Sequence, residues 1–107
     1  MENAKNTEIL MNTLELLAIF NKQASDKGEF HIISIDLMGK RPVVDISKEL
    51  PCMKPRFISK NFITMETIIN GISFRKDYVR SLITNNDEFN EVYKRINAAK
   101  AIGDVTQ

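Results

Sequence analysis

The dipeptide Asn70-Gly71 lies between two runs of β-branched and aromatic residues, in the stretch FITMETIINGISFRKDYV at positions 62–79. Asn-Gly in this setting is the strongest short-range signal for a β-hairpin, because both residues tolerate the positive φ of a type I′ turn. In the register set by this turn, Glu66 faces Arg75, and such an opposite-charge pair stabilises a hairpin by a few tenths to about 1 kcal/mol. The stretch therefore predicts two antiparallel strands.

The same region also matches in part the apolar pattern of a helix-turn-helix over residues 64–83, in which FRKDYVRSLI would be the DNA-reading helix. Two departures count against this interpretation. Ile69 stands where a small residue is needed between the helices, and Gly71 lies inside the first helix, where glycine is a poor helix former. The hairpin is preferred, and the helix-turn-helix is the alternative.

A second hairpin is predicted over residues 29–48, EFHIISIDLMGKRPVVDISK. A two-residue loop at Gly39-Lys40 places glycine first, as a type II′ turn requires, and sets Ile35 opposite Val44. The paired residues then share one apolar face, as period-2 burial requires: Ile33, Ile35, Leu37, Pro42, Val44 and Ile46. The Pro-containing segment 49–61 is interpreted as a loop with a short extended piece at 56–60.

A long amphipathic helix is predicted over residues 7–27, with Asn6 or Thr7 as its N-cap and Gly28 just past its end. Its apolar residues recur at i, i+3, i+4 and i+7: Ile9, Leu10, Thr13, Leu14, Leu16, Leu17, Phe20 and Ala24. A second helix is predicted over 84–101, capped by Thr84 or Asn86 and ended by Gly103.

These elements predict a single α+β domain over residues 1–107, with frayed ends at 1–6 and 103–107. The expected order is α-β-β-β-β-α. Two hairpins form an antiparallel four-stranded sheet, and the long N-terminal helix packs on one face of it.

The apolar surface of the first helix is wider than one face of a sheet requires. Met11, Ala18 and Ile19 lie outside the main stripe. We therefore expect these three residues to contact a partner protein, including a second copy of the chain.

Residues for catalysis or metal binding are few. One cysteine and one histidine cannot supply a four-ligand zinc site, and nothing in the sequence orients His31 and Cys52 as a catalytic pair. Asp36 and Asp45 share the polar face of the first hairpin, where we expect both to be solvated. We predict no catalytic residue, no metal site and no cofactor.

Basic and aromatic residues around the second hairpin carry the alternative of nucleic-acid binding, since phosphate contacts need Lys and Arg and exposed aromatic rings stack on bases. The candidates are Lys54, Arg56, Lys60, Arg75, Lys76, Tyr78 and Arg80. The net charge of only +1 is unlike that of proteins that coat nucleic acid.

The sequence thus favours a small non-catalytic protein that binds another protein, as an accessory, adaptor or inhibitor, over a DNA-binding regulator. The start MENAKNTEIL lacks the order of a signal peptide, no apolar run is long enough to span a membrane, and one cysteine suits a reducing cytoplasm. Ile, Asn and Lys make up 34 of 107 residues, which is typical of an AT-rich genome such as that of a low-GC bacterium or its phage.

Overall fold

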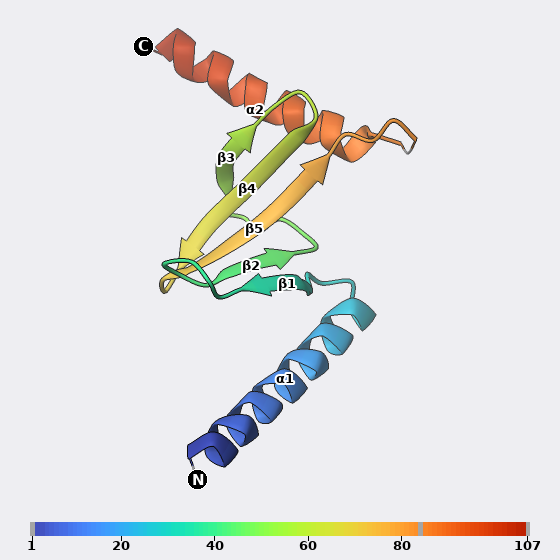
Figure 1. The fold of residues 1–107 in the computed structure, drawn as a ribbon. Helices are drawn as coiled ribbons and strands as arrows, with labels where there is room; N and C mark the ends of the chain where they lie inside the picture. Colours follow the sequence, from blue (N-terminus) through green and yellow to red (C-terminus); the bar gives the residue numbers. More distant parts are fainter. Residues whose placement is uncertain (1, 84, 107) are drawn as a thin grey trace.

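The computed structural model describes residues 2–83 and 85–106, which form two helices and one sheet (Figure 1). The helices are α1 (Glu2–Asp26) and α2 (Asp87–Thr106). The strands are β1 (Ile32–Asp36), β2 (Val43–Ile46), β3 (Lys54–Ile58), β4 (Phe62–Ile69) and β5 (Ile72–Val79). They lie in the order β1-β2-β5-β4-β3. The α+β class is confirmed, but the prediction of four antiparallel strands is wrong, since the sheet has five strands and the β2–β5 pair is parallel.

The β4–β5 hairpin forms in the predicted register, from Phe62 opposite Val79 to Ile69 opposite Ile72. Asn70 has φ 52° and Gly71 has φ 79°, as a type I′ turn requires. The helix-turn-helix at 64–83 is therefore wrong. Local turn chemistry and β-branched residues outweigh the apolar spacing on which that alternative depended.

Replacing Gly71 by alanine is expected to lower the free energy of unfolding by about 1 kcal/mol or more, because a Cβ is disfavoured at positive φ. No neighbouring atom lies within 4 Å of the position that the new methyl group would occupy, so the cost comes from the backbone conformation and not from crowding. Gly39→Ala is the matched control, since Gly39 is not in the left-handed region. Thermal melting of both variants checks this, and an equal or raised Tm for Gly71→Ala would contradict the turn.

The first hairpin has the predicted register at its centre, with Ile35 opposite Val44, but its turn is wrong. The strands end at Asp36 and Val43, so a six-residue loop replaces the two-residue type II′ turn. A bulge at Ile33 places Ile32, rather than Ile33, opposite Ile46. One extra residue in a strand turns its neighbours to the other face, and Ile33 is accordingly 64% exposed.

The segment expected to be a loop at 49–61 contains β3, which pairs antiparallel with β4. The expected extended piece at 56–60 overlaps this strand but begins two residues too late. Pro55 is tolerated because β3 is an edge strand, where a missing backbone donor costs no ladder hydrogen bond. The segment was interpreted as a loop because prolines and charged residues are common both in loops and in edge strands.

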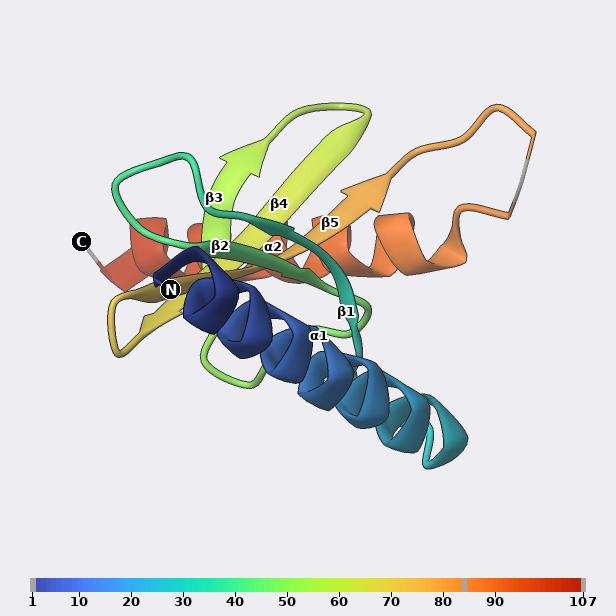
Figure 2. The same cartoon turned by 60° about the horizontal axis from the view of Figure 1, so that its bottom comes forward.

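The hydrophobic core lies between the sheet and α2, which crosses it (Figures 1 and 2). It consists of Val44, Ile46, Met53, Ile63, Met65, Tyr78, Phe89, Val92 and Ile96. The expectation that the N-terminal helix packs on the sheet is wrong, because α1 meets the sheet only near its C-terminal end, at the edge strand β1. An apolar stripe predicts that one side of a helix is buried, but it does not say which surface buries it.

The helix ends follow the sequence in part. Gly28, with φ 70°, ends α1 as predicted, and the Asn86 carbonyl accepts a hydrogen bond from the Asn90 amide at the start of α2. The expected start of the first helix at Asn6 or Thr7 is wrong, since α1 already begins at Glu2.

The expected end of the second helix at Gly103 is wrong too, because α2 continues to Thr106. One glycine in a helix costs only about 1 kcal/mol, which is not enough to end it. Helical turns therefore reach into both segments expected to fray, and Met1, Gln107 and the candidate cap Thr84 lie outside the described residues.

The molecule is elongated. Its radius of gyration is 17.5 Å and its longest dimension is 61 Å, whereas a compact domain of this length has a radius of gyration of about 13 Å. The difference arises because α1 projects from the sheet instead of folding back onto it (Figure 1).

Candidate functional site

The anchor of α1 is a small set of contacts at its C-terminal end. The Asn21 side chain donates to the carbonyl of Ile32 and accepts from its amide, both at 2.8 Å, so it pairs with the edge of β1 as a neighbouring strand would. The rings of Phe20 and Phe30 lie 5.8 Å apart, and Ala24 is buried. These contacts set the direction in which the rest of α1 leaves the sheet.

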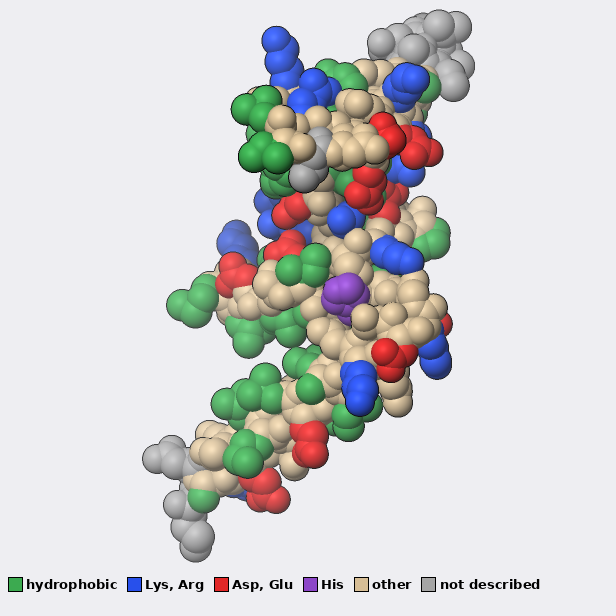
Figure 3. Space-filling view, turned by 90° about the vertical axis from the view of Figure 1, so that its right-hand side faces the viewer, with side chains coloured by type: hydrophobic (Ala, Val, Ile, Leu, Met, Phe, Trp, Pro, Cys, Tyr) green, Lys and Arg blue, Asp and Glu red, His purple; other side chains and the backbone are tan. Residues whose placement is uncertain are grey.

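Most apolar side chains of α1 beyond this anchor are exposed to solvent. A wedge-shaped gap separates the helix from the β1–β2 loop, and hydrophobic side chains line both sides of it (Figure 3). We call the exposed apolar side chains of the main stripe of α1 and of the β1–β2 loop, taken together, the notch face: Ile9, Leu10, Leu14, Leu16 and Phe20 on α1, and Leu37 and Met38 on the loop. Their exposure ranges from 40% at Phe20 to 93% at Met38.

The three residues that the sequence singled out on α1 are exposed, but only two of them, Met11 and Ala18, adjoin the notch face. At about 100° per residue, Met11 and Ala18 flank the main stripe, whereas Ile19 lies about 140° from Leu14, beside the charged residues of the helix. The larger surface is the main stripe itself. Sequence reasoning missed it because that stripe was assigned to the protein's own core.

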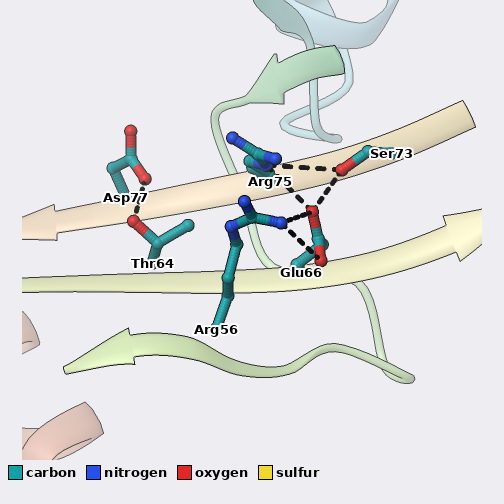
Figure 4. A network of polar contacts seen from close by, with 6 residues as sticks. All are labelled: Arg56, Thr64, Glu66, Ser73, Arg75 and Asp77. Atoms are coloured by element: carbon teal, nitrogen blue, oxygen red, sulfur yellow. Dashed lines mark hydrogen bonds and ion pairs between the residues drawn. The ribbon is translucent and has the colours of Figure 1, made fainter. Parts of the chain in front are cut away.

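The basic candidates for nucleic-acid contact are divided between the two faces of the sheet. Arg56 and Arg75 both lie against Glu66, at 3.1 and 2.9 Å (Figure 4). Lys76 and Tyr78 lie on the opposite face, because side chains alternate along β5. The remaining candidates are Lys54 and Lys60, which are exposed, and Arg80, whose guanidinium lies 4.9 Å from the Phe89 ring centre.

Tyr78 is a core residue rather than an exposed aromatic ring. Its hydroxyl donates to Glu49 at 2.9 Å, and Arg95 donates to the same carboxylate oxygen at 2.7 Å. Burial, and then the hydrogen bond to Glu49, raise the pKa of Tyr78 well above its usual range. The residue is 7% exposed, so it offers no free face on which a base could stack.

Glu66 is the centre of a polar network on the sheet face that α2 does not cover. Burial acts to raise its pKa, but hydrogen bonds from Ser73 and Arg75, with the charges of Arg56 and Arg75, outweigh that effect and lower the pKa of Glu66. The neighbouring pair, Thr64 and Asp77, is joined by a 2.8 Å hydrogen bond (Figure 4). Through these hydrogen bonds and ion pairs, Glu66 of β4 links β3 on one side to β5 on the other.

The lowered pKa of Glu66 predicts a pH dependence of stability. A carboxyl group whose pKa is lower in the folded state stabilises the fold above its unfolded pKa of 4.5, and this contribution is lost as the pH falls below that value. Glu66→Gln should therefore cost about 1.5–3 kcal/mol at neutral pH, the size of hydrogen bonds to a charged group, and less in acid. Urea unfolding at neutral pH and below pH 4.5 measures this, and an unchanged difference would contradict it.

The polar residues considered for catalysis have structural partners. His31 Nδ1 lies 3.1 Å from the Ser47 hydroxyl, because the bulge in β1 shifts the register. Asp45 accepts from Ser34 and Asp36 accepts from the Met38 amide. Cys52 is exposed. Among residues 2–83 and 85–106, no three or more His, Cys, Asp or Glu side chains are grouped so as to hold a metal ion.

The chain has no significant match among protein-family models, curated proteins or solved structures. In the part of the chain that is described, neither helix is long and apolar enough to cross a membrane.

Two other apolar features lie away from the notch face. A groove of about 520 Å³ between the sheet and α2 is lined by Met53, Pro55, Ile58, Met65, Arg95, Ile96 and Ala99. Leu82 and Ile83 are almost fully exposed in the loop before α2. The notch face differs from both in extending along about three turns of a helix, from Ile9 to Phe20 of α1.

Proposed function

We propose that this protein acts without catalysis, as a small accessory, adaptor or inhibitor that binds another protein chain through the notch face. The observation that carries the proposal is a projecting helix whose main apolar stripe is exposed on a molecule of 17.5 Å radius of gyration. Contiguous apolar patches of several hundred Å² on soluble proteins mark interaction sites.

The charges of α1 support binding on one side of the helix. Four charged residues, which are exposed, lie on the side opposite the apolar stripe: Glu8, Glu15, Lys22 and Asp26. An amphipathic helix of this kind presents its apolar side to a groove on its partner. A partner can therefore cover the stripe without burying an unpaired charge, which would be costly.

Two polar side chains within the stripe, those of Thr13 and Asn21, already have hydrogen-bond partners. The Thr13 hydroxyl donates to the Ile9 carbonyl at 2.8 Å, and the Asn21 amide is paired with Ile32. A buried polar group without a hydrogen bond costs about 1–3 kcal/mol. Neither residue would incur that cost when the notch face is covered.

Position-specific photo-crosslinking tests the proposal. A photoreactive amino acid is placed at Leu14, on the notch face, and in the matched control at Glu15, about 100° away on the charged side. After irradiation in an extract of the native host, we expect covalent adducts with a polypeptide from position 14 and none, or far fewer, from position 15. Absence of adducts from position 14, or equal yields at both positions, would contradict the proposal.

The alternative function, nucleic-acid binding, predicts a different experimental result. Since the basic residues are split between two faces and two of them pair with Glu66, we expect no salt-sensitive binding of duplex DNA tighter than about the micromolar non-specific range. Fluorescence anisotropy at several salt concentrations measures this. Nanomolar, salt-dependent binding would favour the DNA-binding alternative instead.

A further inference from the structure

The outer edge of β3 lies at the opposite end of the sheet from β1, where α1 is attached (Figure 1). Among the described strands, β3 is last in the sheet order and pairs only with β4. The Ser59 amide donates to the Phe62 carbonyl at 2.8 Å, so these two residues form a hydrogen-bonded pair at the end of the ladder. Because such pairs alternate with non-hydrogen-bonded pairs, the amide and carbonyl of Ile58 point away from β4, toward the open edge. This edge can therefore pair with another strand.

The apolar groove between the sheet and α2 adjoins this edge. It is lined by Pro55 and Ile58 of β3, by Ile96 and Ala99 of α2, and by the buried Met65 of β4. Its volume of about 520 Å³ is within the range of clefts that hold ligands, roughly 300–1,000 Å³. In a strand added beside β3, every second side chain would lie on the α2 side of the sheet and enter the groove.

The charges at this edge select the kind of strand that fits. The residues of β3 and those that line the groove include three basic side chains, Lys54, Arg56 and Arg95, and no carboxylate. Arg56 pairs with Glu66 and Arg95 with Glu49, but both basic side chains remain more than half exposed, at 52% and 56%. Lys54 is exposed. An edge with this charge attracts an acidic segment and repels a second copy of itself.

We propose that the outer edge of β3 and the adjoining groove bind an extended, acidic peptide segment of another protein, with aliphatic residues at alternate positions. The segment pairs with the backbone of Ile58 and inserts its aliphatic side chains into the groove. Its acidic side chains lie on the other face of the sheet, near Lys54 and Arg56. Pro55 has no amide to donate, so the pairing is short, within the roughly 17 Å of the five residues of β3. This second surface goes beyond the notch face and lets the protein hold two partners at once.

A displayed library of random short peptides, selected against the full-length protein, tests the proposal. We expect the enriched sequences to alternate aliphatic with acidic residues. The affinity of a synthetic copy of an enriched peptide should fall as the salt concentration rises, because salt screens the attraction to the basic edge. Enrichment of basic peptides, or of none, would overturn the proposal.

Two neighbouring alanines of α2 provide a matched pair of variants. Ala99→Glu places a negative charge in the groove and should weaken the binding of the selected peptide about tenfold or more. Ala98→Glu adds the same charge about 100° away around the helix and should bind the peptide nearly as wild type does. Circular dichroism checks that both variants are folded. Equal affinities of the two variants would overturn the groove as the binding site.

Strand pairing is tested on the peptide itself, which leaves the protein unaltered. A methyl group on a peptide nitrogen removes the donor, so methylation of the amides that face β3 should abolish binding, whereas methylation of the amides between them should not. The same effect at every position would overturn the extended strand. If no peptide is enriched and wild type sediments as a dimer that Ala99→Glu dissociates, a second copy of the chain covers this edge and the proposal is wrong.

Discussion

Replacing Ile63 by alanine is expected to lower the free energy of unfolding by about 2–5 kcal/mol, the range for truncating a buried isoleucine. Ile63 is fully buried in β4, with Ile58 of β3 opposite it on one side and Tyr78 of β5 on the other. The core holds few residues, so the cavity left by the lost methyl and methylene groups would remove contacts that no other part of the fold replaces.

The matched control is Ile68→Ala in the same strand. Ile68 is 49% exposed on the other face of the sheet, so its truncation should cost about 1 kcal/mol or less. Urea unfolding of both variants gives the comparison. Equal losses at the two positions would contradict the core described for β4.

Replacing Asn21 by alanine is expected to lower the free energy of unfolding by about 2–3 kcal/mol. The substitution removes two hydrogen bonds and leaves both the amide and the carbonyl of Ile32 without their side-chain partner at the sheet edge. It should also loosen the attachment of α1, because Asn21 provides the polar part of the anchor. The notch would then lose its defined shape.

Amide hydrogen exchange and urea unfolding measure these two consequences. In Asn21→Ala the Ile32 amide should exchange much faster than in wild type, while the amides of β4 change only with global stability. Asn12→Ala, on the exposed polar side of the same helix, should alter neither. Unchanged protection at Ile32 would show that Asn21 does not hold α1.

Local chemistry was enough to predict the second hairpin. Asn70-Gly71 determines the turn, and the turn then sets every pair up to Phe62 and Val79. The first hairpin was predictable only at its centre. Nothing in the sequence marks the bulge at Ile33, because Ile32 and Ile33 are both isoleucine and the apolar pattern does not show which of them faces the core.

The pairing of strands that are distant in the sequence could not be predicted. The parallel contact of β2 with β5 joins segments separated by two other strands, and turn residues carry no information on it. For β3, Pro55 and the flanking basic residues are typical both of a loop and of a protected edge strand.

The candidate site could not be predicted for a similar reason. The stripe of α1 was visible in the sequence, but amphipathicity predicts that one side of a helix is covered and does not say by what. Asn21, which decides where the helix is attached, looks like any polar residue beside the stripe. Leu37 and Met38 were assigned to the hairpin, so their exposure beside α1 could not be foreseen.

The most direct test of protein binding by the notch face is hydrogen exchange along α1 with and without an extract of the native host. A projecting helix without packing is marginally stable in water, so its amides exchange quickly unless another chain covers it. We predict that amides in residues 9–19 of wild type are protected when host extract is present and exchange rapidly without it, and that they exchange rapidly under both conditions in Leu14→Glu, which places a charge in the notch face. Rapid exchange of residues 9–19 in wild type at every concentration, with or without host extract, would contradict the claim that the notch face binds a protein.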